Sequence, residues 1–209
     1  MQRNGEGDIW VFGYGSLMWN PGFPYAEVRS AQLHGYHRAF CLYSEHYRGT
    51  PERRGLVLGL DRGGSCVGRA FRVAAADAAA AMDYLIAREM FGHAVDVYAL
   101  KWLRVALGVA PSGEAGSTSS PSPRARAGRG ERQVSRGASV VRAACFVVNP
   151  AHDHYAGKLP PARIADIIAA ASGQSGSNRD YLANTIAHLD ELGIADGPLH
   201  AVHRLVSKV

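Results

Sequence analysis

The stretch Trp10-Val-Phe-Gly-Tyr-Gly-Ser-Leu-Met-Trp19 runs from apolar residues into two glycines that bracket a tyrosine. Residues 9–12 are apolar and predict a short β-strand that ends at Gly13. Glycine permits tight backbone geometry, so Gly13 and Gly15 can leave successive N–H groups exposed as a nest for a carboxylate. The Ser16 hydroxyl would be a further donor, and Tyr14 a wall or donor. Taken alone, however, the stretch is more simply explained as an ordinary turn after a strand.

Outward from this stretch, the sequence is strand-rich first and helix-rich later. Runs of β-branched and aromatic residues bounded by glycine, proline and charged turns predict strands at 31–43, 56–60, 66–73, 95–109 and 138–148. Alanine-rich or amphipathic stretches predict helices at 74–90, 161–171, 180–192 and 198–206. Asn178 is the expected cap of the third helix, and Gly193 lies past its end. This order, without regular βαβ alternation, predicts an α+β fold with a small barrel and flanking helices.

The composition indicates one globular domain. The chain has 209 residues, of which 47% are hydrophobic, and contains no apolar run of the roughly 18 residues that would span a membrane. The N-terminus shows no secretory signal, which favours the cytoplasm. Three cysteines far apart in mostly apolar surroundings are best explained as buried free thiols. Residues 1–8 are predicted to be a flexible start, with a single domain over 9–209.

Residues 111–137 interrupt this domain with a segment rich in serine, glycine, proline and arginine. The segment has too few apolar residues to offset its ordering entropy, so we expect it to be disordered. Strand-like sequence on both sides makes it an insertion in a strand connection. Its five arginines and two glutamates contribute +3 of the chain's net charge of +5, which leaves 5 − 3 = +2 for the rest. The basic character is therefore local, and nucleic acid is not the expected partner.

Known cofactor and metal motifs are incomplete in this sequence. Gly13-x-Gly15-x-x-Met18 lacks the third glycine of a dinucleotide fingerprint, and no serine is flanked by glycines at −2 and +2. The pairs His152/His154 and His200/His203 have no third ligand at suitable spacing, so a polar turn and a helix surface explain them better. No organic cofactor and no metal are expected.

Glu89 is the candidate for acid–base chemistry. It lies near the end of the predicted helix 74–90, where the negative end of the helix dipole disfavours its charged form. Its apolar neighbours in sequence would desolvate the carboxylate and raise its pKa in the same way. Both effects would make Glu89 a better proton carrier near neutral pH. A solvated glutamate at a helix end is the commoner outcome, and composition alone does not choose between the two.

Several motifs, in order along the chain, together resemble the ChaC family of glutathione-specific γ-glutamylcyclotransferases. They are Val-Phe-Gly-Tyr-Gly-Ser-Leu-Met-Trp-Asn-Pro at 11–21, Gly35-Tyr-His-Arg-Ala-Phe-Cys-Leu42, Arg88-Glu89-Met90, Asn149-Pro150 and the segment 169–182. The likeness covers nearly the whole chain except the first eight residues and the insertion, which departs from the family pattern. It is most similar to the bacterial branch.

This resemblance implies a γ-glutamylcyclotransferase-like fold and the cleavage of glutathione to 5-oxoproline and cysteinylglycine, without cofactor or metal. It implies Glu89 as the catalytic acid/base, and a γ-glutamyl pocket formed by Val11, Phe12, Gly13, Tyr14, Gly15 and Ser16. The expected partner is a small molecule, and neither nucleic acid nor a membrane. Two alternatives stay open: a cyclotransferase for other γ-glutamyl amines or dipeptides, and a non-catalytic regulatory binding protein.

Four other residues have competing interpretations. Tyr155 and Tyr181 could line the pocket, but packing in the core or on the surface is at least as good an explanation for each. Arg38 and Arg72 could meet a substrate carboxylate, although an ion pair within the barrel is the simpler expectation.

Overall fold

The structure is a computed structural model that describes residues 7–90, 96–108 and 139–208. Its centre is a closed five-stranded barrel with the strand order β1-β3-β2-β4-β5. The strands are β1 (Ile9–Gly13), β2 (Glu27–Ser44), β3 (Gly55–Val73), β4 (Tyr98–Leu107) and β5 (Val140–Val148). Neighbouring strands pair antiparallel except β1 and β5, whose parallel pairing closes the barrel. The predicted α+β barrel of mixed strands is confirmed.

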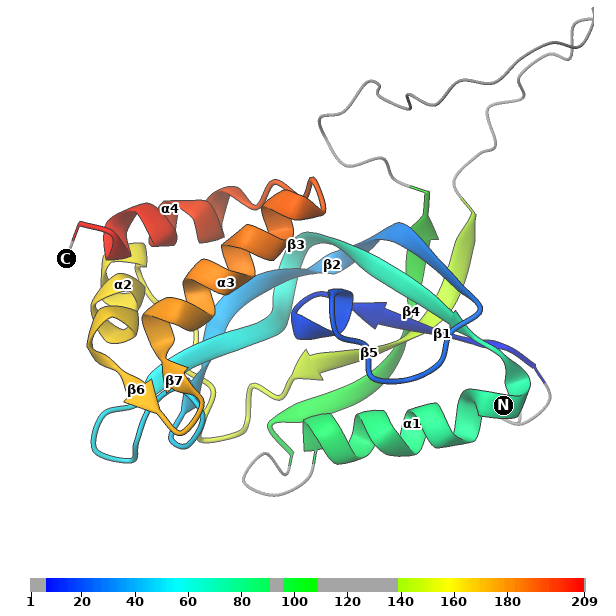
Figure 1. Ribbon diagram of the computed structural model, residues 1–209, viewed down its shortest axis with the longest axis horizontal. Coiled ribbons are helices and arrows are strands. Elements are labelled where there is room, and N and C mark those ends of the chain that lie inside the picture. Colours follow the sequence, from blue (N-terminus) through cyan, green and yellow to red (C-terminus); the bar gives the residue numbers. More distant parts are fainter. Residues whose placement is uncertain (1–6, 91–95, 109–138, 209) are drawn as a thin grey trace, which may run out of the picture.

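Four helices flank this barrel on two sides (Figure 1). They are α1 (Ala75–Met90), α2 (Pro161–Ala170), α3 (Asn178–Glu191) and α4 (Gly197–Val206). Figure 1 shows α2, α3 and α4 together at one end of the molecule, whereas α1 runs alone along another side of the barrel. The two-residue strands β6 (Ser172–Gly173) and β7 (Gly176–Ser177) form a small hairpin that leads into α3. The sequence did not predict this hairpin.

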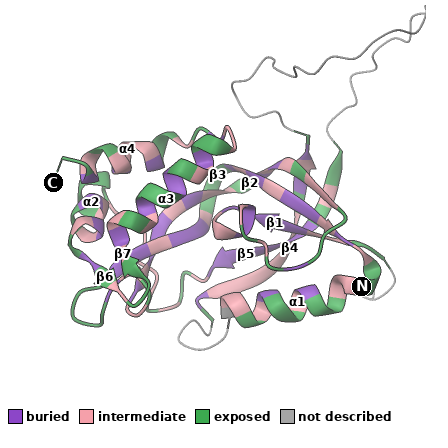
Figure 2. Ribbon diagram, in the orientation of Figure 1, coloured by how far each residue is buried: buried purple, intermediate pink, exposed green. Residues whose placement is uncertain are grey.

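Buried residues lie along the barrel strands and on one face of the helices (Figure 2), and the two larger clusters that they form follow the same division. Phe12 and Leu60 of the barrel join Ile168, Leu182 and Leu189 of the helical end in one cluster of fully buried side chains. On the other side, the apolar face of α1 packs on the outside of the barrel. The members of that second cluster include Val11, Phe71 and Leu85. Apolar area removed from water on both faces therefore fixes the helices to the sheet.

One strand prediction was wrong: residues 56–60 and 66–73 belong to a single long strand, β3. The glycines Gly63 and Gly64, which suggest a turn, have φ values of 99° and 66°. They lie at an irregularity in the β2–β3 ladder, where pairing passes from His34↔Ser65 to Tyr36↔Arg62. Such an irregularity bends a strand without ending it, and glycine tolerates the positive φ that the bend requires.

The expected cap of α3 is also displaced by one residue. The side chain of Ser177 accepts a hydrogen bond from the amide of Asp180 and is the N-cap. Asn178 is fully buried, and its amide group makes two hydrogen bonds with the backbone of Leu56, at 2.6 Å and 2.8 Å. Asn178 therefore joins the start of α3 to β3, which is a tertiary role that local sequence does not reveal.

The remaining expectations have mixed outcomes. Cys41, Cys66 and Cys145 are free and buried, as predicted. Within the described ranges, every helix is too short or too polar to cross a membrane. Residues 1–6 of the predicted flexible start and the whole insertion 111–137 lie outside the described residues. Asp8, by contrast, is described, and its carboxylate accepts hydrogen bonds from Arg72 and from the amide of Ala75.

Candidate active site

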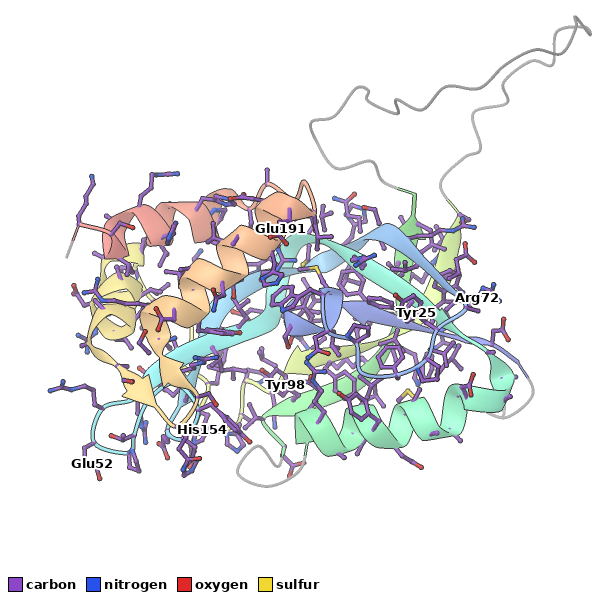
Figure 3. All side chains as sticks on the ribbon, viewed as in Figure 1. Tyr25, Glu52, Arg72, Tyr98, His154 and Glu191 are labelled. Carbon is purple, nitrogen blue, oxygen red and sulfur yellow. The ribbon has the colours of Figure 1, made fainter. Side chains whose placement is uncertain are left out.

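Two adjoining cavities lie where the barrel, the end of α1 and the helical end of the molecule meet. The larger has a volume of about 530 Å³, within the range of small-molecule sites. The smaller has a volume of about 60 Å³ and is lined by the loop after β1. Four residues line both cavities: Ser16, Glu89, Tyr98 and Tyr181. We call the smaller the inner pocket and the larger the outer cavity; Figure 3 labels Tyr98 and His154, two residues of the outer cavity.

The loop after β1 builds the wall of the inner pocket. It turns into a short 3-10 helix, η1 (Ser16–Met18), in which the amide of Met18 donates to the carbonyl of Gly15 at 2.9 Å. Tyr14, Gly15 and Ser16 line the pocket. A β-carbon added at Gly15 would meet no atom within 4 Å, so close packing does not require glycine at this position.

The other three residues of the predicted γ-glutamyl pocket lie beneath the loop. Val11 and Phe12 are fully buried core residues of β1. Gly13 lines neither cavity, and a β-carbon there would lie 3.1 Å from Leu17 and 3.3 Å from Phe71. Its missing side chain lets the loop fold back closely over the strand. The structure therefore brings Tyr14, Gly15 and Ser16 together with Glu89, and gives Val11, Phe12 and Gly13 a supporting position.

Glu89 lies on the wall shared by the two cavities, with only 18% of its side chain exposed. Burial raises the pKa of its carboxyl above the ordinary value of 4.5, and the positive charge of Arg88 opposes this rise. The nearest guanidinium nitrogen of Arg88 is 3.5 Å from the carboxylate. A glutamate with a raised pKa in a cavity is suited to accept and return a proton near neutral pH.

Three tyrosines surround this carboxylate with neutral hydroxyls. Burial raises the pKa of Tyr14 and of Tyr98 well above the usual value of 10, and the pKa of Tyr181 to about 12. The Tyr98 hydroxyl donates to the carbonyl of Leu58 at 3.0 Å. Neutral phenols offer hydrogen-bond donors and apolar ring faces to a ligand without adding charge beside Glu89.

Arg88 ties the end of α1 to the loop after β1. Its Nη2 donates to the Ser16 hydroxyl at 2.9 Å, and its Nη1 donates to the carbonyl of Asn20 at 2.9 Å. The same Nη1 lies 3.0 Å from the hydroxyl of Tyr84, one helical turn earlier. These contacts fix Glu89, the next residue, relative to the loop. The sequence contains Arg88 within a family motif, but its partners become visible only in the folded chain.

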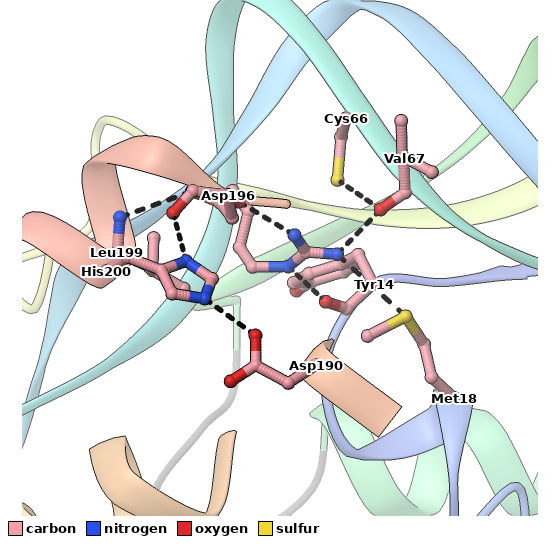
Figure 4. Close-up of polar contacts among 9 residues, drawn as sticks. Tyr14, Met18, Cys66, Val67, Asp190, Asp196, Leu199 and His200 are labelled. Atoms are coloured by element: carbon pink, nitrogen blue, oxygen red, sulfur yellow. Dashed lines mark hydrogen bonds and ion pairs between the residues drawn. The ribbon is translucent and has the colours of Figure 1, made fainter. Parts of the chain in front are cut away.

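A second arginine, Arg38, also contacts this loop, and Figure 4 shows its partners Tyr14, Val67 and Asp196. Its side chain is 1% exposed, and its Nε donates to the carbonyl of Tyr14. Nη2 donates to the carbonyl of Val67 and Nη1 to Asp196, both at 2.8 Å. Asp196 is also the N-cap of α4. Arg38 therefore forms an ion pair with the N-cap of α4 and not within the barrel as expected, and Arg72 pairs with Asp8 and Glu27 at the surface.

Comparison with known proteins identifies the family of this chain. The family model described as "ChaC-like protein" matches residues 9–209. The chain belongs to the ChaC family. It is 33% identical over 207 residues to the glutathione-specific γ-glutamylcyclotransferase of Escherichia coli, a match that covers 99% of this chain and 76% of that protein.

More distant ChaC relatives include eukaryotic proteins. The γ-glutamylcyclotransferase 2-3 of Arabidopsis thaliana is 30% identical, over 90% of this chain and 83% of that protein. A crystal structure of a glutathione-specific γ-glutamylcyclotransferase from yeast superposes with a TM-score of 0.75 at 23% identity, over 97% of both chains. This likeness establishes that the two proteins share a fold.

The outer cavity contains the residues of this ChaC protein that the sequence analysis missed. Its far wall comes from the end of β2 and the connection to β3, and includes Glu45, His46 and Arg48. His154 and Ser175 reach it from separate later segments. The charged residues between two strands were a signal of a surface loop, but nothing local indicated that the loop faces Glu89.

The residues with competing interpretations are now placed. Tyr181 lines both cavities, whereas Tyr155 lines neither, and its hydroxyl donates to Asp61 at 3.0 Å. His200 pairs with Asp190 at 2.8 Å on the helical end. In the part of the chain that the structure describes, no three His, Cys, Asp or Glu side chains are grouped to hold a metal ion.

Proposed function

We propose that this ChaC protein is a γ-glutamylcyclotransferase that cleaves glutathione into 5-oxoproline and cysteinylglycine. The observation that carries the proposal is the position of Glu89. Its largely buried carboxylate lies on the wall shared by the inner pocket and the outer cavity, and the loop Tyr14–Leu17 lines the inner pocket with it. The relatives that are named as glutathione-specific cyclotransferases support the same activity.

The proposed reaction is intramolecular. The α-amine of the γ-glutamyl residue attacks its own γ-carbonyl carbon, which forms the C–N bond of the five-membered ring. The amide bond to cysteine then breaks, and the leaving nitrogen departs as an amine. Ionised Glu89 takes the proton that the attacking nitrogen loses and gives it to the leaving nitrogen, so the enzyme ends in its starting state. No external nucleophile is consumed.

The inner pocket would hold the reacting end of the substrate in a curled conformation. Holding two reacting groups in contact can contribute on the order of 7 kcal/mol or more to lowering a barrier. Tyr14, Gly15 and Ser16 form one side of this pocket, and Phe146 and Leu58 lie on the barrel side. The Ser16 hydroxyl is held by Arg88, and the carbonyl of Tyr14 by Arg38. The loop is thus fixed before any substrate arrives, as efficient positioning requires.

The decisive test is the Glu89→Gln variant, incubated with glutathione while 5-oxoproline is measured by mass spectrometry. The amide keeps the shape of the side chain but carries no proton between the two nitrogens, so we expect turnover to fall by at least about 100-fold, the scale of lost acid–base catalysis. Binding of glutathione, measured by calorimetry, should persist. Near-native production of 5-oxoproline by this variant would contradict the assignment of Glu89.

The same assay addresses the two alternatives. Rates on glutathione and on γ-glutamyl dipeptides separate a glutathione enzyme from a broader cyclotransferase. A wild-type protein that binds these compounds but releases 5-oxoproline from none of them would instead be the regulatory binding protein.

A further inference from the structure

Arg48 is a cation that the fold holds in place at the outer cavity. It lies in the connection between β2 and β3, is half-buried, and lines the cavity. Its Nη1 donates to the carbonyls of Ser175 and Ser177 in the β6–β7 hairpin. Its guanidinium carbon lies 5.0 Å from the centre of the Tyr181 ring, within cation–π distance. The guanidinium is therefore oriented by two carbonyls and an aromatic face.

Arg48 has no acidic partner among the described residues, unlike two other arginines nearby. Arg88 lies 3.5 Å from Glu89, and Arg54, which lines neither cavity, pairs with Glu45 at 2.7 Å. Those two glutamates are the acids that line the outer cavity, and each is engaged by another arginine. Within the described residues, the hydrogen bonds of the Arg48 guanidinium use Nη1 alone. Its Nε and Nη2 remain for a ligand, and a guanidinium suits a carboxylate because it can donate two parallel hydrogen bonds.

The positions of the two cavities indicate which carboxylate of the substrate Arg48 would bind, namely the one at the end far from the reacting carbonyl. Glutathione has one carboxylate on its γ-glutamyl residue and another on its terminal glycine. The first is attached to the same carbon as the attacking amine, so it must lie near Glu89 and the inner pocket. Arg48 lines only the outer cavity, whereas Glu89 lines both. The leaving dipeptide, which extends outward from the reacting carbonyl, is the part that reaches Arg48.

We propose that Arg48 binds the terminal carboxylate of the leaving dipeptide and so sets the preference for glutathione over γ-glutamyl compounds that lack this group. The inference rests on the proposed function and deepens it, because it names the residue that recognises the leaving dipeptide of the substrate. Tyr181, stacked against Arg48 and shared by both cavities, would lie beside the peptide between the two ends.

The test compares glutathione with its C-terminal amide, in which the glycine carboxylate is replaced by an uncharged carboxamide. For the wild type, we expect kcat/KM to be roughly 10- to 100-fold higher on glutathione, the range for a hydrogen bond to a charged group. Arg48→Met should lose this preference, because its kcat/KM falls much more on glutathione than on the amide. Arg48→Lys should keep part of the preference through its charge. Arg62→Met removes an exposed arginine of the same hairpin that lines neither cavity, and should behave as wild type.

This comparison of substrates distinguishes a loss of carboxylate recognition from a loss of correct folding. An Arg48→Met protein that loses activity equally on both tripeptides would overturn the inference, because a folding or positioning defect cannot distinguish an acid from an amide. A wild type that does not prefer the acid would also overturn it. Calorimetric binding of both tripeptides to wild type and Arg48→Met distinguishes a failure of the proposed function itself. Arg48-dependent binding of glutathione without 5-oxoproline would contradict only the catalytic proposal.

Discussion

Glu89 combines burial with a neighbouring positive charge, and the two act on its proton in opposite directions. Burial raises its pKa, whereas Arg88 lowers it, and the net shift is upward. The ionised form is therefore less stable in the folded protein than in the unfolded chain. Natural active sites often carry such a cost in stability because the chemistry requires the charged group to be there.

This cost predicts that Glu89→Gln is more stable than the wild type at neutral pH. A group with a raised folded pKa contributes stability below its unfolded pKa, near 4.5, and loses that contribution as pH rises through the folded pKa. Glutamine removes the charge at every pH, so its advantage should be about 1 kcal/mol at pH 7–8, typical of a single stabilising substitution, and should shrink toward pH 4. Urea unfolding across this pH range measures the difference. An advantage that does not change with pH would contradict the explanation.

At the residue scale, the sequence indicated the residues proposed for catalysis better than it indicated the residues that hold them in place. Glu89 and the glycine-rich loop carry local signals, namely a carboxylate at a helix end and paired glycines after a strand. Arg38 and Arg48 carry none, because their function depends on carbonyls and a ring that are distant in the chain. Sequence patterns report local geometry, and these arginines act through tertiary contacts.

At the scale of elements, the start of α4 combines two functions in Asp196. Its carboxylate caps the helix by accepting from the amide of Leu199 at 3.2 Å, and it also pairs with the buried Arg38. Through Arg38, the helical end of the molecule is connected to the loop that lines the inner pocket (Figure 4). A substitution at the start of α4 should therefore affect the active site.

We predict that Asp196→Ala destabilises the protein by roughly 3–5 kcal/mol, because it leaves Arg38 buried without a counter-charge. Activity of the folded fraction should also fall, since the loop at Tyr14 loses its fixed support. Ser177→Ala is the matched control: it removes the N-cap of α3 but touches no buried charge, so it should cost only about 1 kcal/mol. Chemical unfolding and kcat/KM at a permissive temperature measure both effects. Equal costs for the two variants would show that capping alone accounts for Asp196.

The elements themselves were largely predictable, because their signals are repeated along many residues. The predicted helix 74–90 differs from α1 by one residue, and the strand 138–148 differs from β5 by two. The errors arose where one or two residues determine whether an element ends or continues, as at Gly63 and Gly64 in β3. There, pairing with β2 outweighed the local preference of glycine for a turn.

At the scale of the whole molecule, the barrel already brings together the ends of the strands that flank the insertion. Ala106 pairs with Val140 in the β4–β5 ladder, and the amide of Leu107 donates to the carbonyl of Ser139 at 2.7 Å. A short turn can therefore connect β4 to β5 directly. Residues on either side of the insertion make the strand contacts that close the barrel, and the described residues that line the two cavities lie outside the insertion.

We accordingly predict that replacing residues 109–138 with a four-residue turn leaves kcat/KM on glutathione unchanged and raises the melting temperature. Each halving of the length of a connecting loop lowers the entropic cost of closing it by about 0.6 kcal/mol, so about three halvings give a gain of up to ~2 kcal/mol. For a domain of this size, that corresponds to a rise of several degrees. Calorimetric melting and 5-oxoproline release measure the two quantities on the same preparation. A shortened protein that melts higher but turns over poorly would show that the insertion takes part in substrate access, while one that melts lower would show that it stabilises the barrel.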